Sequence, residues 1–275
     1  MTAYLRTPPP HLRTSETVRR MTWKWIAALG PACAAGIFLG HIHTLAVLGM
    51  SVAGALSAEA AFQPLTPPTG EGKAQLDFSN GSSVWTGLLF ALLLPPAAPL
   101  WMAALGSFFA VFVGKEIFGG IGAYPFHPVL AGYVFLILNF PWIEAPAFEE
   151  GRAVIFAGAL AAGGGLLLAL KLIQWEVPFL YLSAVFFLSQ AGNYDARAFI
   201  LNPGILLSAF FFITDPGTTP LTRHGRRIFA IAAAFLTLIF AAASGASASA
   251  AFAVLTMNAF TPWLDHGMSA SRKKL

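Results

Sequence analysis

The residues best suited to bind a ligand lie beside interruptions in long apolar runs. One interruption is ITDPGTTP, where Asp215 follows the apolar run that ends at Ile213. A carboxylate there can accept hydrogen bonds from a ring N–H or a hydroxyl of a bound molecule, and Thr214, Thr218 and Thr219 add hydroxyl groups. Ordinary turn chemistry is the alternative interpretation, because Asp-Pro-Gly sequences form turns that Asp or Thr can cap.

The second interruption, KEIFGGIGAYPFHP, offers a different set of groups. Its candidates are a charged pair, three glycines and two rings: Lys115, Glu116, Gly119, Gly120, Gly122, Phe126 and His127. The glycines let backbone N–H groups approach an oxygen-rich ligand, the phenyl ring can pack on another ring, and the imidazole can donate a hydrogen bond. A flexible connector beside a solvated ion pair is the alternative interpretation.

The sequence favours neither a metal site nor a cluster site. His41 and His43 have the H-x-H spacing of a ligand pair, but no further ligand follows nearby, and we expect a polar turn there. Cys33 is the only cysteine, and a single thiol cannot supply the four ligands of an iron–sulfur cluster.

The elements that position these groups are membrane segments. The chain is 57% hydrophobic and only 10% charged, whereas soluble domains carry about 25% charged residues. Uncharged stretches long enough for one or two crossings predict about ten segments. We place them at 22–40, 42–62, 84–99, 100–114, 128–142, 153–170, 177–191, 203–213, 228–243 and 247–264.

Proline and glycine interrupt the third, fifth and eighth segments, which we therefore expect to be broken or half-length helices. Non-helical backbone at membrane depth is tolerated only where it is buried in protein or lines a polar cavity. The expected fold is an all-α polytopic membrane protein whose site lies beside these breaks.

Basic residues predict the orientation. With ten segments and a cytoplasmic N-terminus, only Arg152 and Arg197 of the sixteen lysines and arginines fall outside. The positive-inside rule thus places both termini on the cytoplasmic side of a bacterial inner membrane. Since no basic face belongs to a soluble domain, we expect no nucleic-acid partner.

The chain also resembles itself at an offset of 121 residues, which aligns Pro95 with Pro216 and Pro99 with Pro220. Five segments on either side of an acidic loop predict two inverted repeats. The resulting division is a cytoplasmic arm, a first repeat, an outer loop, a second repeat and a basic tail, at 1–21, 22–142, 143–152, 153–264 and 265–275.

Two long blocks carry a family resemblance. The block from Ser82 to Leu136, SSVWTGLLFALLLPPAAPLWMAALGSFFAVFVGKEIFGGIGAYPFHPVLAGYVFL, closely resembles the RnfD/NqrB family. The block from Phe210 to Phe229, FFFITDPGTTPLTRHGRRIF, is similar to the Thr-Asp-Pro signature of that family. Its members are the D subunit of Rnf electron-transport complexes and the B subunit of the sodium-pumping NADH:quinone oxidoreductase.

The resemblance implies a flavin-bearing membrane subunit, with a fold similar to urea and ammonium channels, that passes electrons across the bilayer. Family members bind FMN covalently through a Thr in a Ser-Gly-Ala-Thr-type motif, in the outer loop after segment five. They can also hold riboflavin or FMN noncovalently.

This sequence departs from the family pattern in two places. The loop PWIEAPAFEEGR, residues 141–152, contains no Thr or Ser, so we expect no covalent FMN. The similar SGAS, residues 244–247, lies between segments nine and ten, lacks Thr, and suits close helix packing. His127 stands where the family usually has Asn, which alters the donor pattern.

We therefore expect a noncovalent flavin, riboflavin or FMN, where the two interruptions meet near the cytoplasmic ends of the broken helices. The predicted binding residues are Lys115, Gly119, Gly120, Phe126, His127, Thr214, Asp215 and Thr218. Other membrane or periplasmic electron-transfer subunits are the expected partners, and ion transport is a further process that the electron flow could drive. A small-solute or flavin channel or transporter, or a membrane anchor for a partner oxidoreductase, are the alternative functions.

Overall fold

The computed structural model describes residues 17–62, 80–95, 97–141 and 150–272, and these residues form helices and connecting turns without a strand. Most of the predicted arm, the outer loop from 143 to 149 and the last three residues of the tail lie outside these ranges, as does Pro96.

The first half of the chain forms a long helix and a set of short ones. The elements are α1 (Val18–Phe62), α2 (Ser82–Leu93), α3 (Leu100–Phe112), the 3₁₀ turn η3 (Glu116–Phe118) and α4 (Pro128–Asn139). α1 consists of two helical parts that meet at His41, whose φ of 54° and ψ of −146° are not helical. The polar turn expected at His41 is therefore the point at which the chain reverses.

The second half alternates long helices with an interrupted one. The elements are α5 (Glu150–Ala169), α6 (Glu176–Ala191), α7 (Ala196–Leu201), α8 (Pro203–Leu207), the π-helical turn η4 (Ser208–Phe212), α9 (Arg223–Ala241) and α10 (Ala246–Arg272). α8 begins where Asn202 Oδ1 accepts a hydrogen bond from the Gly204 N–H (2.9 Å), with Pro203 at the first helical position, where its missing N–H costs nothing.

The first two predicted segments coincide with the two parts of α1, the other eight each coincide with a helix of the described chain, and α7 is an additional short helix. The third segment is shorter than predicted because Leu94 is extended (φ −77°, ψ 152°), as a residue before proline prefers. The number of membrane crossings and the inverted repeat remain predictions.

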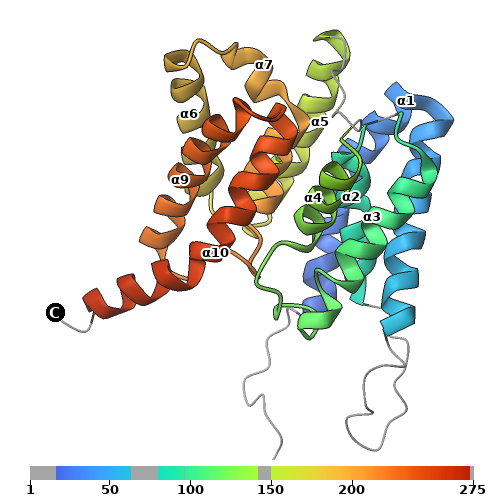
Figure 1. The fold of residues 1–275 in the computed structure, drawn as a ribbon, viewed down its shortest axis with the longest axis horizontal. Coiled ribbons are helices and arrows are strands. Elements are labelled where there is room, and N and C mark those ends of the chain that lie inside the picture. Colours follow the sequence, from blue (N-terminus) through green and yellow to red (C-terminus); the bar gives the residue numbers. More distant parts are fainter. Residues whose placement is uncertain (1–16, 63–79, 96, 142–149, 273–275) are drawn as a thin grey trace, which may run out of the picture.

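The helices form a bundle of two groups, seen side by side in Figure 1. In one group α1 packs on α2 and α3, and in the other α9 packs on α6 and α10. α5 packs on α1 and α8, while α10 reaches across to α4. The start of α1 and the end of α10 lie at the same end of the bundle (Figure 1).

Exposed and buried side chains indicate a multi-pass membrane protein. Among the residues that the structure describes, four helices are long and apolar enough to cross a bilayer: Val18–Phe62, Leu100–Phe118, Gly151–Ala169 and Arg223–Ala241. Large apolar side chains such as Phe38, Phe187 and Phe235 are exposed on the outer surface, where lipid can solvate them.

Glycines allow the closest helix crossings in the first half. A Cβ atom at Gly54 of α1 would overlap the Ala104 carbonyl oxygen and the Ser107 hydroxyl of α3. A Cβ atom at Gly87 of α2 would lie 2.8 Å from the Val52 Cα of α1. At these crossings van der Waals contact between backbones replaces the hydrophobic driving force that is weak in lipid.

We predict that Gly54→Ala destabilises the protein by about 1–3 kcal/mol, because the added methyl group must displace backbone. Gly49→Ala, on the same helix, is the matched control, since its methyl group would meet nothing within 4 Å. The measurement is the midpoint of thermal unfolding in mild detergent. Equal midpoints for the two variants would contradict the close contact between α1 and α3.

Candidate functional site

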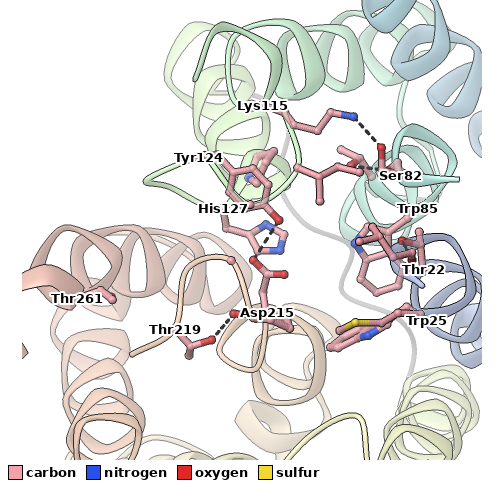
Figure 2. Close-up of a pocket in the computed structure, with 18 of the residues that line it drawn as sticks. Thr22, Trp25, Ser82, Trp85, Lys115, Tyr124, His127, Asp215, Thr219 and Thr261 are labelled. Atoms are coloured by element: carbon pink, nitrogen blue, oxygen red, sulfur yellow. Dashed lines mark hydrogen bonds between the residues drawn. The ribbon is translucent and has the colours of Figure 1, made fainter. Parts of the chain in front are cut away.

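The two interruptions predicted to be neighbours meet at a cavity of about 480 Å³. Its walls come from the start of α1, the start of α2, the loop from 115 to 128, the turn from 215 to 221 and the end of α10. Figure 2 shows Tyr124 and His127 on one side and Asp215 facing them from the other.

Asp215 and Tyr124 join the two interruptions across 91 residues of sequence. The Tyr124 hydroxyl donates to Asp215 Oδ2 at 3.5 Å, and the Thr218 hydroxyl donates to the same oxygen at 3.3 Å. Burial, and then the nearby Asp215 carboxylate, raise the pKa of Tyr124, so its hydroxyl stays protonated. Burial also raises the pKa of the Asp215 carboxyl to about 6, although its hydrogen bonds oppose the shift.

Asp215 also organises its own turn, as the alternative interpretation expected. Its carbonyl oxygen accepts hydrogen bonds from the N–H groups of Thr218 (3.3 Å) and Thr219 (3.2 Å) and from the Thr219 hydroxyl. α10 holds this turn in place, because Thr261 donates to the Thr218 carbonyl and Asp265 accepts from the Leu221 N–H (both 3.0 Å). The backbone of Asp215 caps a turn while its carboxylate lines the cavity.

His127 presents a buried nitrogen atom without a partner. It precedes α4, its side chain is 2% exposed, and its ring lies 4.8 Å from that of Phe212 in an edge-to-face arrangement. Nδ1 is buried and has no hydrogen-bond partner within the described part of the chain. Burial lowers the pKa of His127 to about 3, so the imidazole is neutral and has one donor and one acceptor nitrogen.

The backbone of His127 is held by a polar residue of α10. With its amide oriented to satisfy both ends, Asn258 accepts a hydrogen bond from the His127 N–H (3.0 Å) and donates one to the Val254 carbonyl (3.3 Å). Asn258 is 2% exposed, so this pairing accounts for a buried amide and fixes the position of the imidazole.

Lys115 forms a charged part of the wall, and its side chain is also buried. Nζ donates to the hydroxyls of Ser82 (2.9 Å) and Ser83 (3.1 Å) and lies 2.9 Å from a Glu116 carboxylate oxygen. Ser83 in turn donates to Glu59 of α1. All three N–H bonds of the ammonium group are thus engaged, and the lysine joins α1, α2 and the loop after α3.

Aromatic rings form the opposite wall. Trp25 and Trp85 both line the cavity, with ring centroids 5.1 Å apart and ring planes at 76°. Phe211 packs behind them, 6.3 Å from Trp25 and 5.9 Å from Trp85. Such rings offer faces and edges against which a planar conjugated ligand can pack.

Three of the eight predicted site residues line the cavity, namely Lys115, His127 and Asp215. Thr218 supports Asp215, whereas the Thr214 hydroxyl donates to the Phe210 carbonyl in the helix before it (2.6 Å). The other three predicted residues belong to the loop between α3 and α4 and do not line the cavity.

Gly119 and Gly120 adopt left-handed φ values of 110° and 87° in the turn after η3, and their N–H groups bond back to Glu116 and Lys115. Phe126 is 38% exposed and is not part of the cavity wall. These three residues shape the loop that carries Tyr124 and His127.

Sequence reasoning missed Tyr124, Trp25 and Trp85. Both tryptophans lie near predicted segment ends, where an interfacial aromatic belt explains them without a ligand. Trp25, however, is only 5% exposed and packs inside the bundle. Tyr124 stands within the predicted loop, but its direction depends on the left-handed glycines before it.

Comparisons with known proteins identify the family of the chain. Residues 6–147 and 145–274 match the NQR2, RnfD, RnfE family. The D subunit of the ion-translocating oxidoreductase complex of Methanosarcina acetivorans is 32% identical over 281 residues, covering 96% of this chain and 95% of that protein. The D subunit of the Na⁺-translocating ferredoxin:NAD⁺ oxidoreductase complex of Acetobacterium woodii is 27% identical over 93% of this chain and 91% of its own length. The proton-translocating counterpart of Clostridium ljungdahlii is 28% identical over 93% and 92%.

We predict that Asp215→Asn changes how stability depends on pH. Because the folded-state pKa of about 6 lies above the ordinary value near 3.9, ionising this carboxyl opposes folding. The native protein should lose about 1–3 kcal/mol relative to the variant as the pH rises from about 4 to above 6.

The measurement is thermal unfolding in detergent across that range. Asp195→Asn is the control, since Asp195 is an exposed cap of α7. A constant difference between the native protein and Asp215→Asn at every pH would show that Asp215 does not titrate in this window.

Proposed function

The chain belongs to the NQR2, RnfD, RnfE family, and we propose that it is the membrane subunit of an ion-translocating electron-transport complex and binds a flavin noncovalently. Its relatives are named as the D subunit of such complexes, in versions that translocate Na⁺ or protons. The partners we propose are the other subunits of the complex, which supply and remove electrons.

The observation that carries the flavin proposal is His127, a residue of the cavity wall whose buried Nδ1 has no hydrogen-bond partner within the described part of the chain. A buried polar atom normally has a hydrogen-bond partner. The cavity, at about 480 Å³, falls within the range of roughly 300–1,000 Å³ typical of ligand sites. A ligand that brings both hydrogen-bonding groups and a planar apolar ring system fits these walls.

Different residues of the cavity wall would contact different parts of the flavin. The neutral imidazole of His127 and the Asp215 carboxyl would bond to the polar edge or the ribityl chain, while Trp25 and Trp85 would pack on the ring system. Lys115, paired with Glu116 and held by Ser82 and Ser83, would form a charge-balanced polar part of the wall. When bound, a flavin would supply one- and two-electron transfer.

We propose noncovalent attachment because neither of the two segments that could anchor FMN offers a suitable hydroxyl group. The loop from 141 to 152 has no Thr or Ser. Ser247 of SGAS is 3% exposed and donates to Asn202 Oδ1 at 2.8 Å, and that oxygen also caps α8. Esterifying Ser247 would remove this support of a helix cap, so we propose that the serine is structural.

The ten-segment topology with two inverted repeats belongs to the same proposal. The aligned prolines Pro95 and Pro216 lie in the α2–α3 connection and in the turn before α9, respectively. The first connection lies near the start of α8, and the second lies at the cavity with the start of α2. The break at Pro95 and the break at Pro216 thus lie at opposite ends of α2. Inverted repeats require that corresponding breaks lie at opposite ends of the bundle.

We expect gently purified protein to be yellow with a flavin absorption spectrum, and Asp215→Ala to bind that flavin roughly tenfold to a hundredfold more weakly. The physical reason is a ligand group left unpaired in a buried site, which costs about 1–3 kcal/mol. Occupancy is measured as flavin per protein after a defined wash, and the flavin should be lost on denaturing gels.

Asp195→Ala is the matched control, because it removes a capping carboxylate of α7 away from the cavity. Folded Asp215→Ala protein with full occupancy would refute the site. Colourless native protein would instead favour a transporter or a membrane anchor. A fluorescent band on denaturing gels that disappears in Ser247→Ala would show covalent attachment at SGAS.

Reporter fusions test the topology. Fusions at Glu149 and Lys274 should report opposite sides of the membrane, with Lys274 in the cytoplasm, because five further segments separate the two positions. If both fusions report the same side, the ten-segment topology and the inverted repeat are contradicted.

A further inference from the structure

A second cavity, of about 470 Å³, opens between the α5–α6 turn and the start of α9. Its walls are Leu168, Lys171, Ile173, Gln174, Trp175, Glu176 and Arg223. It shares no lining residue with the cavity around Asp215. Neither the electron-transfer function nor the flavin proposal uses these side chains.

An ion-pair network fixes two guanidinium groups beside this cavity. Arg223 bonds to both carboxylate oxygens of Glu176, through Nε at 3.2 Å and through Nη2. Arg227 Nε donates to Glu176 Oε2 at 2.8 Å. Each guanidinium group has five N–H bonds in a rigid fork, so the edges turned away from Glu176 can bind another anion.

The cavity region carries surplus positive charge. Lys171, Arg223 and Arg227 oppose the carboxylate of Glu176. The first turns of α6 and α9 also lie here, and the N-terminal ends of helices carry partial positive charge. The partial positive charge at the start of α9 repels the arginines in its first turn. An additional anion would therefore interact favourably both with these side chains and with the helix ends.

Exposed aromatic rings indicate the depth of the opening in the membrane. Trp175, in the cavity wall, is 64% exposed, and Phe179 one turn further along α6 is 61% exposed. Their ring centroids lie 6.1 Å apart. Tryptophan at a helix end typically lies at the headgroup level, with apolar side chains beyond it in the acyl region.

We propose that this cavity binds the phosphate of an anionic phospholipid. The phosphate would lie against Lys171 and the outward edge of Arg223, and the acyl chains would run along the exposed rings of α6. Glu176 is a positioning residue, since it holds the two guanidinium groups rather than contacting the lipid. A soluble phosphate would gain nothing from the aromatic part, so the lipid is the occupant that uses both halves of the surface.

Lys171 is the residue to change, because it belongs to the cavity wall but not to the ion-pair network. Its backbone has φ of 56°, a left-handed conformation that Asn tolerates. Lys171→Asn therefore removes the charge with little strain, and Lys171→Arg keeps the charge. Arg19→Asn is the matched control, since it removes an exposed charge from the start of α1, outside the cavity.

The experiment titrates the full-length protein in mild detergent with phosphatidylglycerol or phosphatidylcholine and counts bound lipids by native mass spectrometry. We expect tighter binding of phosphatidylglycerol, and a loss of roughly fivefold in Lys171→Asn, as expected from about 1 kcal/mol for each basic residue near a lipid headgroup. Lys171→Arg and Arg19→Asn should bind like the native protein. The readout is independent of flavin content.

Three results would overturn the proposal. Equal affinity for the two lipids would show that no phosphate charge is recognised. Equal losses in Lys171→Asn and Arg19→Asn would show that only the overall charge matters. Thermal stabilisation by inorganic phosphate as large as that by phosphatidylglycerol, absent in Lys171→Asn, would show a site for a soluble anion.

Discussion

Lipid offers no hydrogen bonds, so backbone groups that are freed where a helix of a membrane protein is interrupted need partners within the protein. The start of α8 meets this constraint with Asn202, whose side-chain oxygen accepts from the Gly204 N–H and from Ser247 of the neighbouring α10. At the end of α2 the Leu94 N–H donates to the Ala91 carbonyl oxygen (3.2 Å), and Pro95, which has no N–H, follows. Each of these two interruptions therefore has a hydrogen-bond partner within the protein, a polar side chain at α8 and a backbone carbonyl at α2.

The same constraint explains the polar wall of the Asp215 cavity. Lys115, 3% exposed, has all its N–H bonds engaged by Ser82, Ser83 and Glu116, and Asn258 holds the backbone of His127. Against this background of satisfied groups, Nδ1 of His127 is a buried polar atom without a hydrogen-bond partner in the part of the chain that the structure describes. The flavin proposal rests on these fixed hydrogen-bonding groups together with the aromatic rings of Trp25 and Trp85.

The two cavities use charge differently because they face different surroundings. Lys115 at the inner cavity is neutralised by its neighbours, whereas Lys171 and the arginines of α9 leave surplus positive charge at the periphery. A neutralised lysine suits a buried cofactor, since unpaired charge is costly there. Surplus charge at the edge of the bundle suits contact with anionic lipid.

The sequence by itself determined the helical class, the positions of the segments, the breaks at ITDPGTTP and FGGIGAYPFHP, and the family, because hydropathy, proline and glycine act locally along the chain. Only the tertiary structure decided which residues of those breaks face the cavity. Phe126 and Thr214 are not part of the cavity wall, whereas Tyr124 and Trp25 are, and the Thr214 hydroxyl donates instead to the Phe210 carbonyl one turn earlier. Side-chain direction in a loop depends on contacts between distant segments, and local sequence patterns do not encode those contacts.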